Sequence, residues 1–143
     1  MKTYLLDTTA CIALINGKPA AVRQRFARAL TAGSRLVTST IVAYELCYGV
    51  AKSARQAANK DRLETFLAGP IEIVPFDIDD AETAGYARAA LERAGTPIGA
   101  YDVLIAGQAL RLGATLVTAN ASEFGRVSGL TWANWGGTDR ARR

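Results

Sequence analysis

Short apolar runs alternate along the chain with longer stretches in which apolar residues recur every three or four positions. Such runs predict buried strands, and the periodic stretches predict helices. The expected strands are Tyr4–Leu6, Arg35–Thr38, Ile71–Phe76 and Thr115–Thr118, with an edge segment at Leu130–Trp135. The expected helices cover residues 10–15, 20–31, about 40–53, about 55–68, 78–93 and 101–112, with a short turn at 122–124. This alternation predicts an α/β/α sandwich with a small, mainly parallel sheet.

The composition is that of a globular domain, with 50% hydrophobic and 21% charged residues among 143. A chain of this length buries a core without disulfides, so Cys11 and Cys47 are expected to be reduced and packed inside. No apolar run approaches the roughly 20 residues of a membrane span, and the N-terminus lacks a secretory signal. We expect a cytoplasmic protein with one domain at residues 1–136 and a mobile basic tail at 137–143.

The chain contains no histidine. This absence excludes Ser–His–Asp and Cys–His nucleophilic sites, histidine-dependent general acid–base ribonucleases and His-ligated zinc sites. Chemistry must therefore depend on carboxylates, lysines, hydroxyls or a hard cation. The net charge of +4 suits an anionic partner.

Three acidic residues stand where an ordinary surface acid is not expected. Asp7 ends the first strand, at the sheet edge where open α/β folds bind ligands, although it can equally cap the next helix. Glu45 projects from an apolar helix face, where an uncompensated buried carboxylate is unfavourable. Asp102 opens a strongly apolar helix, either as a cap or first-turn acid or as part of a site.

A hard divalent cation would account for all three acids together. Mg²⁺ and Mn²⁺ prefer oxygen ligands, commonly a few carboxylates plus water. Such an ion ionises a bound water and neutralises charge on a phosphoryl oxygen, which is work that histidine would otherwise do.

Short motifs in a fixed order carry a resemblance to a known family. They are Tyr4-Leu5-Leu6-Asp7-Thr8-Thr9, Tyr44-Glu45-Leu46 with Tyr48-Gly49, Pro97-Ile98-Gly99-Ala100-Tyr101-Asp102 with Ile105-Ala106, and Leu116-Val117-Thr118-Ala119-Asn120 with Glu123-Phe124. With the segment from Val127 to Trp135, they resemble PIN-domain ribonucleases of the VapC toxin type over residues 2–135.

The resemblance implies an acidic pocket that holds Mg²⁺ or Mn²⁺ and hydrolyses RNA phosphodiesters, commonly in structured RNA such as tRNA. It further implies a homodimer and inhibition by a cognate antitoxin of the VapB type. Carried over by position, Asp7, Glu45 and Asp102 would bind the metal. Thr9 and Thr118 would orient ligands or water through their hydroxyls.

The sequence departs from the family pattern after the fourth strand. Many PIN domains carry a fourth acid there, whereas this chain has Asn120, with Glu123 three residues later. Glu123 either supplies the missing carboxylate or belongs to a capping box opened by Asn120. The departure leaves the number of bound metals open.

Two other functions fit parts of the sequence. A haloacid-dehalogenase-like phosphotransferase would use Asp7 as the nucleophile, but Thr9 replaces its second acid and only Lys60 is conceivable as its lysine. A catalytically dead module that binds RNA or a partner would have no need of the three acids. The ribonuclease is the better interpretation.

Overall fold

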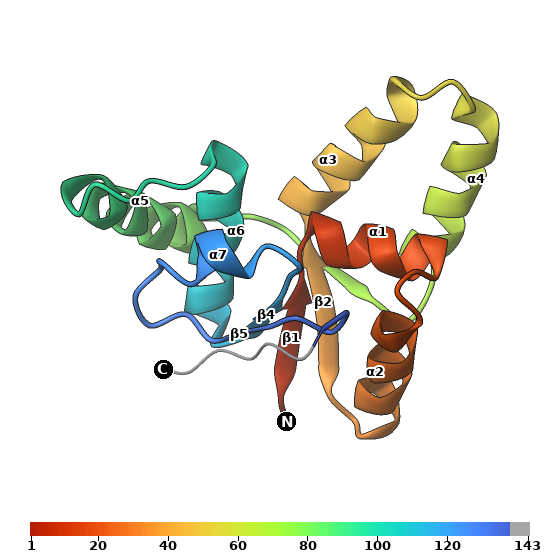
Figure 1. Ribbon diagram of the computed structural model, residues 1–143, viewed down its shortest axis with the longest axis horizontal. Helices are drawn as coiled ribbons and strands as arrows, with labels where there is room; N and C mark the ends of the chain where they lie inside the picture. The colour runs from red at the N-terminus through yellow and green to blue at the C-terminus, as the bar shows by residue number, and fades with distance from the viewer. Residues whose placement is uncertain (138–143) are drawn as a thin grey trace.

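Figure 1 shows the computed structural model, which describes residues 1–137; from residue 138 on, the predicted basic tail lies outside the described residues. The sheet has the strand order β3-β2-β1-β4-β5, and every neighbouring pair is parallel. The strands are β1 (Thr3–Leu6), β2 (Arg35–Ser39), β3 (Glu72–Val74), β4 (Thr115–Val117) and β5 (Trp132–Ala133). The predicted α/β architecture with a mainly parallel sheet is confirmed, and the sheet is parallel throughout.

Helices connect all the strands and cover both faces of the sheet. They are α1 (Thr8–Asn16), α2 (Ala20–Thr31), α3 (Thr40–Ala51), α4 (Gln56–Leu67), α5 (Ile78–Arg93), α6 (Ala100–Leu112) and α7 (Ala121–Phe124). No helix among residues 1–137 is both long and apolar enough to cross a bilayer.

The winding of the chain explains this layering. From β1 the chain steps through β2 to β3, and it then returns past β1 to β4 and β5. Because crossovers between parallel strands are right-handed, the two directions place their helices on opposite faces. Figure 1 shows α1 to α4 on one side of the sheet and α5 to α7 on the other. The winding reverses between β1 and β4, and open α/β sheets bind ligands at the carboxyl ends of strands beside such a reversal.

The core lies on both sides of the central strands. Leu5 and Leu6 of β1, Val37 of β2, Leu116 of β4 and Ile105 of α6 have no exposed surface. Side chains of a parallel strand face covered layers on both sides, so these short strands carry nearly continuous apolar runs. This is the pattern from which the sequence predicts them.

Local signals set the ends of several helices. The Ser39 hydroxyl accepts from the amide of Ile41 and caps α3. Gly17 ends α1 in the left-handed conformation, with φ +75°, which favours glycine. Asp77 and Asp80 form a reciprocal capping box at the start of α5.

Some boundaries and one burial differ from the sequence-based expectations. Helix α1 begins at Thr8 and not at residue 10, because the Asp7 side chain caps it two residues earlier. Strand β3 ends at Val74, before Pro75, which has no amide hydrogen for a sheet hydrogen bond. Cys11 is buried as predicted, but Cys47 is exposed on α3, so its expected core role is wrong.

Helices α5 and α6 pack unusually closely. An added Cβ on Gly107 of α6 would lie 2.5 Å from Cβ of Ala84 in α5. The two helices therefore contact each other at a position where there is no room for a side chain on α6. Nearby, the fully buried carboxylate of Asp80 accepts a hydrogen bond of 2.7 Å from Nε of Arg111. Asp80 and Arg111 thus form a buried ion pair between the helices.

The close contact predicts a sharp difference between two glycines. Gly107→Ala should lower the free energy of unfolding by about 1–3 kcal/mol, because the new methyl group forces α5 and α6 apart. Gly85→Ala in α5 is the matched control, since a Cβ there meets nothing within 4 Å. It should raise stability by about 0.5–1 kcal/mol through helix propensity. Urea denaturation of both variants measures the difference, and equal effects would contradict the packing argument.

Candidate active site

Asp7 lies at the carboxyl end of β1, beside the winding reversal, with only 3% of its surface exposed. Its backbone amide donates to the carbonyl of Val117 at the end of β4. Its Oδ1 accepts from the Ala10 amide at 2.9 Å and from the Thr9 hydroxyl at 2.7 Å. The capping interpretation of Asp7 is therefore confirmed. Because both of these bonds use Oδ1, capping does not prevent a second role for the carboxylate.

Two threonine hydroxyls join Asp7 to the loop after β4. Thr9 donates to Asp7 and accepts from the Ala119 amide at 3.0 Å. The buried Thr118 also hydrogen-bonds the Asp7 carboxylate and accepts from the Asn120 amide at 2.8 Å. Both hydroxyls predicted for the site thus hold Asp7 in one orientation and fix the loop beside it.

Glu45 is half-buried on α3, and its partner is a residue to which the sequence analysis gave no role. The hydroxyl of Thr8 donates to Oε1 of Glu45 across the gap between α1 and α3. Thr8 follows Asp7 directly, so one short segment of chain holds two of the predicted acids. The position of Thr8 directly after Asp7, within the first motif, was the only indication in the sequence that its hydroxyl could belong to the site.

Asp102 lies in the first turn of α6, whose N-cap is Gly99 and not Asp102. Its carboxyl group hydrogen-bonds the carboxyl group of Glu123 from α7. The first-turn interpretation of Asp102 therefore holds, and the capping interpretation is wrong. Gly99 leaves room for this contact, because a Cβ there would lie 3.3 Å from Oδ2 of Asp102.

Glu123 faces the acids and does not close a capping box. Asn120 precedes α7 but makes no side-chain capping bond, and Glu123 contacts Asp102 and the Gly99 amide, the latter at 3.5 Å. The structure thus disfavours the capping alternative for Glu123. The Asn120 side chain hydrogen-bonds Glu123, which places the amide at the edge of the group and not at its centre.

The charges of these acids perturb one another. Burial raises the pKa of Asp7, and the negative charge of Glu45 raises it further, although bonds from Thr118, Thr9 and Ala10 oppose the rise. Burial, the contact with Glu123 and the charges of Asp7 and Glu45 raise the pKa of Asp102 to about 7. The hydrogen bond from Asp102 lowers the pKa of Glu123. Asp102 is therefore the carboxyl that holds the proton shared by the pair.

The donor set fits a hard cation, since it consists of carboxylate oxygens and the nearby negative charges raise the pKa of Asp7 and Asp102. We refer to Asp7, Glu45, Asp102 and Glu123 as the acid cluster. Within residues 1–137, no three acidic or cysteine side chains already converge tightly enough to enclose an ion. Glu45 accepts a hydrogen bond from Thr8, and Glu123 contacts Asp102.

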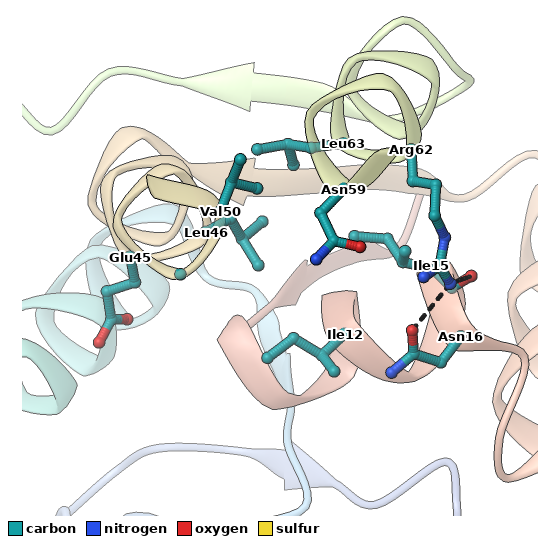
Figure 2. A pocket seen from close by; sticks show the side chains of 10 residues that line it. Ile12, Ile15, Asn16, Glu45, Leu46, Val50, Asn59, Arg62 and Leu63 are labelled. Carbon is teal, nitrogen blue, oxygen red and sulfur yellow. Dashed lines mark hydrogen bonds between the residues drawn. The ribbon is translucent and has the colours of Figure 1, made fainter. Parts of the chain in front are cut away.

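An apolar groove adjoins the acid cluster. It encloses about 220 Å³ between α1, α3 and α4, and its walls include Ile12, Leu46 and Leu63. Figure 2 shows Glu45 at its margin, with the carboxylate pointing away from the apolar side chains. At the far end Arg62 donates to Oδ1 of Asn16 at 2.9 Å. The groove is thus mainly apolar and has Glu45 as its one link to the acid cluster among the described lining residues.

Comparison with known proteins places these features in one group. Residues 4–130 match the PIN domain. The chain is 39% identical over 135 residues to the tRNA(fMet)-specific endonuclease VapC of Shigella flexneri, covering 94% of this chain and 99% of that protein. It is 38% identical over 132 residues to ribonuclease VapC2 of Rickettsia felis, covering 92% and 97%.

Solved structures give the same result. VapBC2 from Rickettsia felis, bound to a DNA fragment from its promoter, superposes with a TM-score of 0.87 at 36% identity, covering 93% of this chain and 98% of that one. DNA-bound VapBC from Salmonella typhimurium superposes with a TM-score of 0.86 at 38% identity, covering 94% and 99%.

The raised pKa of Asp102 predicts a pH-dependent stability effect. Between pH 4 and pH 7 the folded state holds a proton that the unfolded state releases, so the ionised carboxylate destabilises the fold progressively as pH rises. Without added metal, Asp102→Asn should therefore raise the free energy of unfolding at pH 8 by about 1–2 kcal/mol, allowing for solvent screening. At pH 4 the variant and the parent should be nearly equal. Asp61→Asn, an exposed acid of α4, is the matched control and should shift stability equally at both pH values.

Proposed function

The chain belongs to the PIN-domain family, in its VapC branch, and from this we propose that it is an endoribonuclease acting as the toxin of a toxin–antitoxin pair. The observation that carries the proposal is the acid cluster at the winding reversal, in a chain that has no histidine. Relatives at 38–39% identity are named as a ribonuclease and as a tRNA endonuclease. We infer that the substrate is a structured RNA such as tRNA, whose cleavage stops translation and growth.

PIN-domain nucleases generally use divalent metal ions. For this chain we propose that Asp7, Glu45 and Asp102 bind Mg²⁺ or Mn²⁺, with Glu123 as the fourth carboxylate. When bound, such an ion supplies Lewis acidity, which lowers the pKa of a water and neutralises charge on a phosphoryl oxygen.

The residues of the chain prepare the site for this chemistry. Thr9 and Thr118 fix the carboxylate of Asp7, so its orientation does not depend on the substrate. Thr8 holds Glu45 at the opposite wall. Asp102 must release its proton before its carboxylate binds a cation, so cation affinity should rise as pH passes through about 7.

The similar solved structures are toxin–antitoxin complexes, and we propose that this chain likewise forms a homodimer bound by a cognate antitoxin of the VapB type. The apolar groove beside Glu45 offers that partner a surface next to the acid cluster. A basic side chain of the antitoxin placed there would pair with the carboxylates and keep a metal ion out of the acid cluster.

The structure offers little to the other two functions. The position of the second acid of a haloacid-dehalogenase-like phosphotransferase is filled by Thr9, whose hydroxyl is committed to Asp7 and to the Ala119 amide. Lys60 is exposed on α4 and is no partner of the acid cluster among the described residues. A dead binding module gives no reason for four acids whose charges raise the pKa of Asp7 and Asp102.

Substituting Asp7 separates its charge from its structural role. Asp7→Asn keeps an N-cap acceptor but removes the carboxylate, so the fold should persist while kcat for RNA cleavage falls on the order of 100-fold or more. Asp77→Asn, an equivalent cap on α5 far from the acid cluster, is the matched control and should leave turnover unchanged. Cleavage assays with Mg²⁺ and circular dichroism measure both properties. Unchanged hydrolysis by Asp7→Asn would refute the catalytic assignment.

The role of Glu123 is tested by metal dependence. Glu123→Gln preserves the size and hydrogen-bonding capacity of the side chain but removes its charge, so half-maximal cleavage should require several times more Mn²⁺ or Mg²⁺. Ser122→Ala, an exposed neighbour on α7, controls for disturbance of the short helix. Calorimetric titration with Mn²⁺ measures the affinity directly. An unaltered titration would leave a three-carboxylate site.

A further inference from the structure

A second concave site lies at the end of the sheet opposite to the acid cluster. A cavity of about 350 Å³ opens beneath α2 at the amino ends of β1 and β4, the end where Figure 1 marks the N-terminus. Its walls include Lys2 and Tyr4 from β1 and its approach, Arg25 and Arg28 from α2, and Trp132 and Trp135 around β5. At about 3.3 Å per residue, Lys2 and Asp7 are separated by about 16 Å along β1.

Among residues 1–137, the charged side chains in the walls of this cavity are all positive. They are Lys2, Arg25 and Arg28, and no acidic side chain of this part of the chain joins them. Nη1 of Arg25 donates to two backbone carbonyls of the C-terminal segment, at 3.0 and 2.9 Å, so this guanidinium is fixed in place. Lys2 and Arg28 are exposed, and within residues 1–137 neither forms an ion pair. Positive charge concentrated in a concavity attracts anions.

Aromatic faces and hydroxyl groups surround these cations. The rings of Tyr4 and Trp135 contact each other with centroids 5.2 Å apart, and the Lys2 ammonium lies 5.2 Å from the Tyr4 centroid. Ser34 and Thr131 add hydroxyl donors to the walls. Cations and hydroxyls bind phosphate oxygens. Trp135 is buried against Tyr4, but the partly exposed rings of Tyr4 and Trp132 can contact a neighbouring base, so this combination favours a nucleic-acid strand over a simple anion.

We propose that this cavity, the Lys2–Arg28 pocket, binds a backbone phosphate of the RNA substrate remote from the bond that is cut. The proposal rests on the proposed ribonuclease function. For a strand that keeps a helical rise of about 3.4 Å per nucleotide, about 16 Å corresponds to at least about five nucleotides, because the path must follow the surface of the domain and not the buried strand β1. The pocket therefore selects RNAs large enough to reach both ends of the sheet. This gives the chain its own physical reason to prefer a structured RNA to a short fragment.

Salt-dependent binding tests the pocket without any cleavage step. The parent is the Asp7→Asn protein in EDTA, titrated with a fluorescent RNA hairpin at several salt concentrations. Adding Lys2→Gln and Arg28→Gln should weaken binding at least about tenfold at low salt and reduce the slope of log K against log salt by about 0.7–0.9, for the one lost phosphate contact. Lys60→Gln with Arg93→Gln, which removes two exposed cations elsewhere, is the matched control and should change the slope far less.

These outcomes separate the pocket from the proposed function. If the parent binds the hairpin and the pocket variant keeps the parent's slope, the pocket assignment is wrong while the ribonuclease function stands. If the parent binds no RNA, both are wrong. Loss of dimerisation in the pocket variant, measured by light scattering, would indicate a protein interface and would overturn the assignment to RNA.

Intrinsic fluorescence provides a second test on the unsubstituted pocket. The chain has two tryptophans, Trp132 and Trp135, and both line the pocket. The hairpin should alter their emission, whereas a trinucleotide, AMP and inorganic phosphate at the same concentration should not. An equal response to AMP or phosphate would identify a small-anion site. An equal response to duplex DNA of the same sequence would remove the assignment to RNA.

Discussion

The constraint on which this structure depends is the gathering of like charges at one edge of a buried sheet. Asp7 is almost fully buried, and its pKa is raised, yet it is held by Thr9, Thr118 and the amide of Ala10. Those hydrogen bonds reach the loop after β4 and the first turn of α1, so keeping one carboxylate in place also fixes the two elements around it. The other three acids lie on α3, α6 and α7. These helices are separated in the sequence, so only the tertiary fold brings their acids to the same place. The fold holds these carboxylates close together, and a bound cation would offset the repulsion between their negative charges.

The sequence specifies the fold well because its strands are buried on both sides and its helices have clear ends. Apolar runs such as Tyr4–Leu6 and turn signals such as Asn16-Gly17 act locally, so they can be recognised without coordinates. Cys47 escaped prediction because its exposure depends on how α3 leans over the sheet, which no local pattern records. Strand β3 was expected to reach Phe76 because the segment is apolar, although Pro75, which lacks an amide hydrogen, ends it at Val74.

The acid cluster was only partly predictable for a similar reason. Asp7, Glu45 and Asp102 stood out because each conflicts with its surroundings, and the structure brings Asp102 against Glu123 and Thr8 against Glu45. The choice between a capping box and a fourth carboxylate for Glu123 could not be made from spacing, because both need an acid three residues after Asn120. Only the position of α6 relative to α7 decides which neighbour Glu123 meets. Side chains that bridge elements are set by packing, and packing is the least local property of a chain.

The close approach of Gly107 to Ala84 fixes α6 at one point, so a tilt of the helix about this fulcrum would move the residues at its ends. Asp102 lies five residues from this fulcrum, or about 8 Å along the helix axis, so a tilt of roughly 10° there would swing the carboxylate by about 1.4 Å. Displacements of about 1 Å are enough to slow an enzyme on the order of 100-fold when reacting groups must be aligned. Ala84 bears no polar side-chain atom and is buried on the far helix, yet its smallness helps to aim an acid that it never touches. Two residues without any reactive group, Gly107 and Ala84, thus help to set where the carboxylate of Asp102 lies.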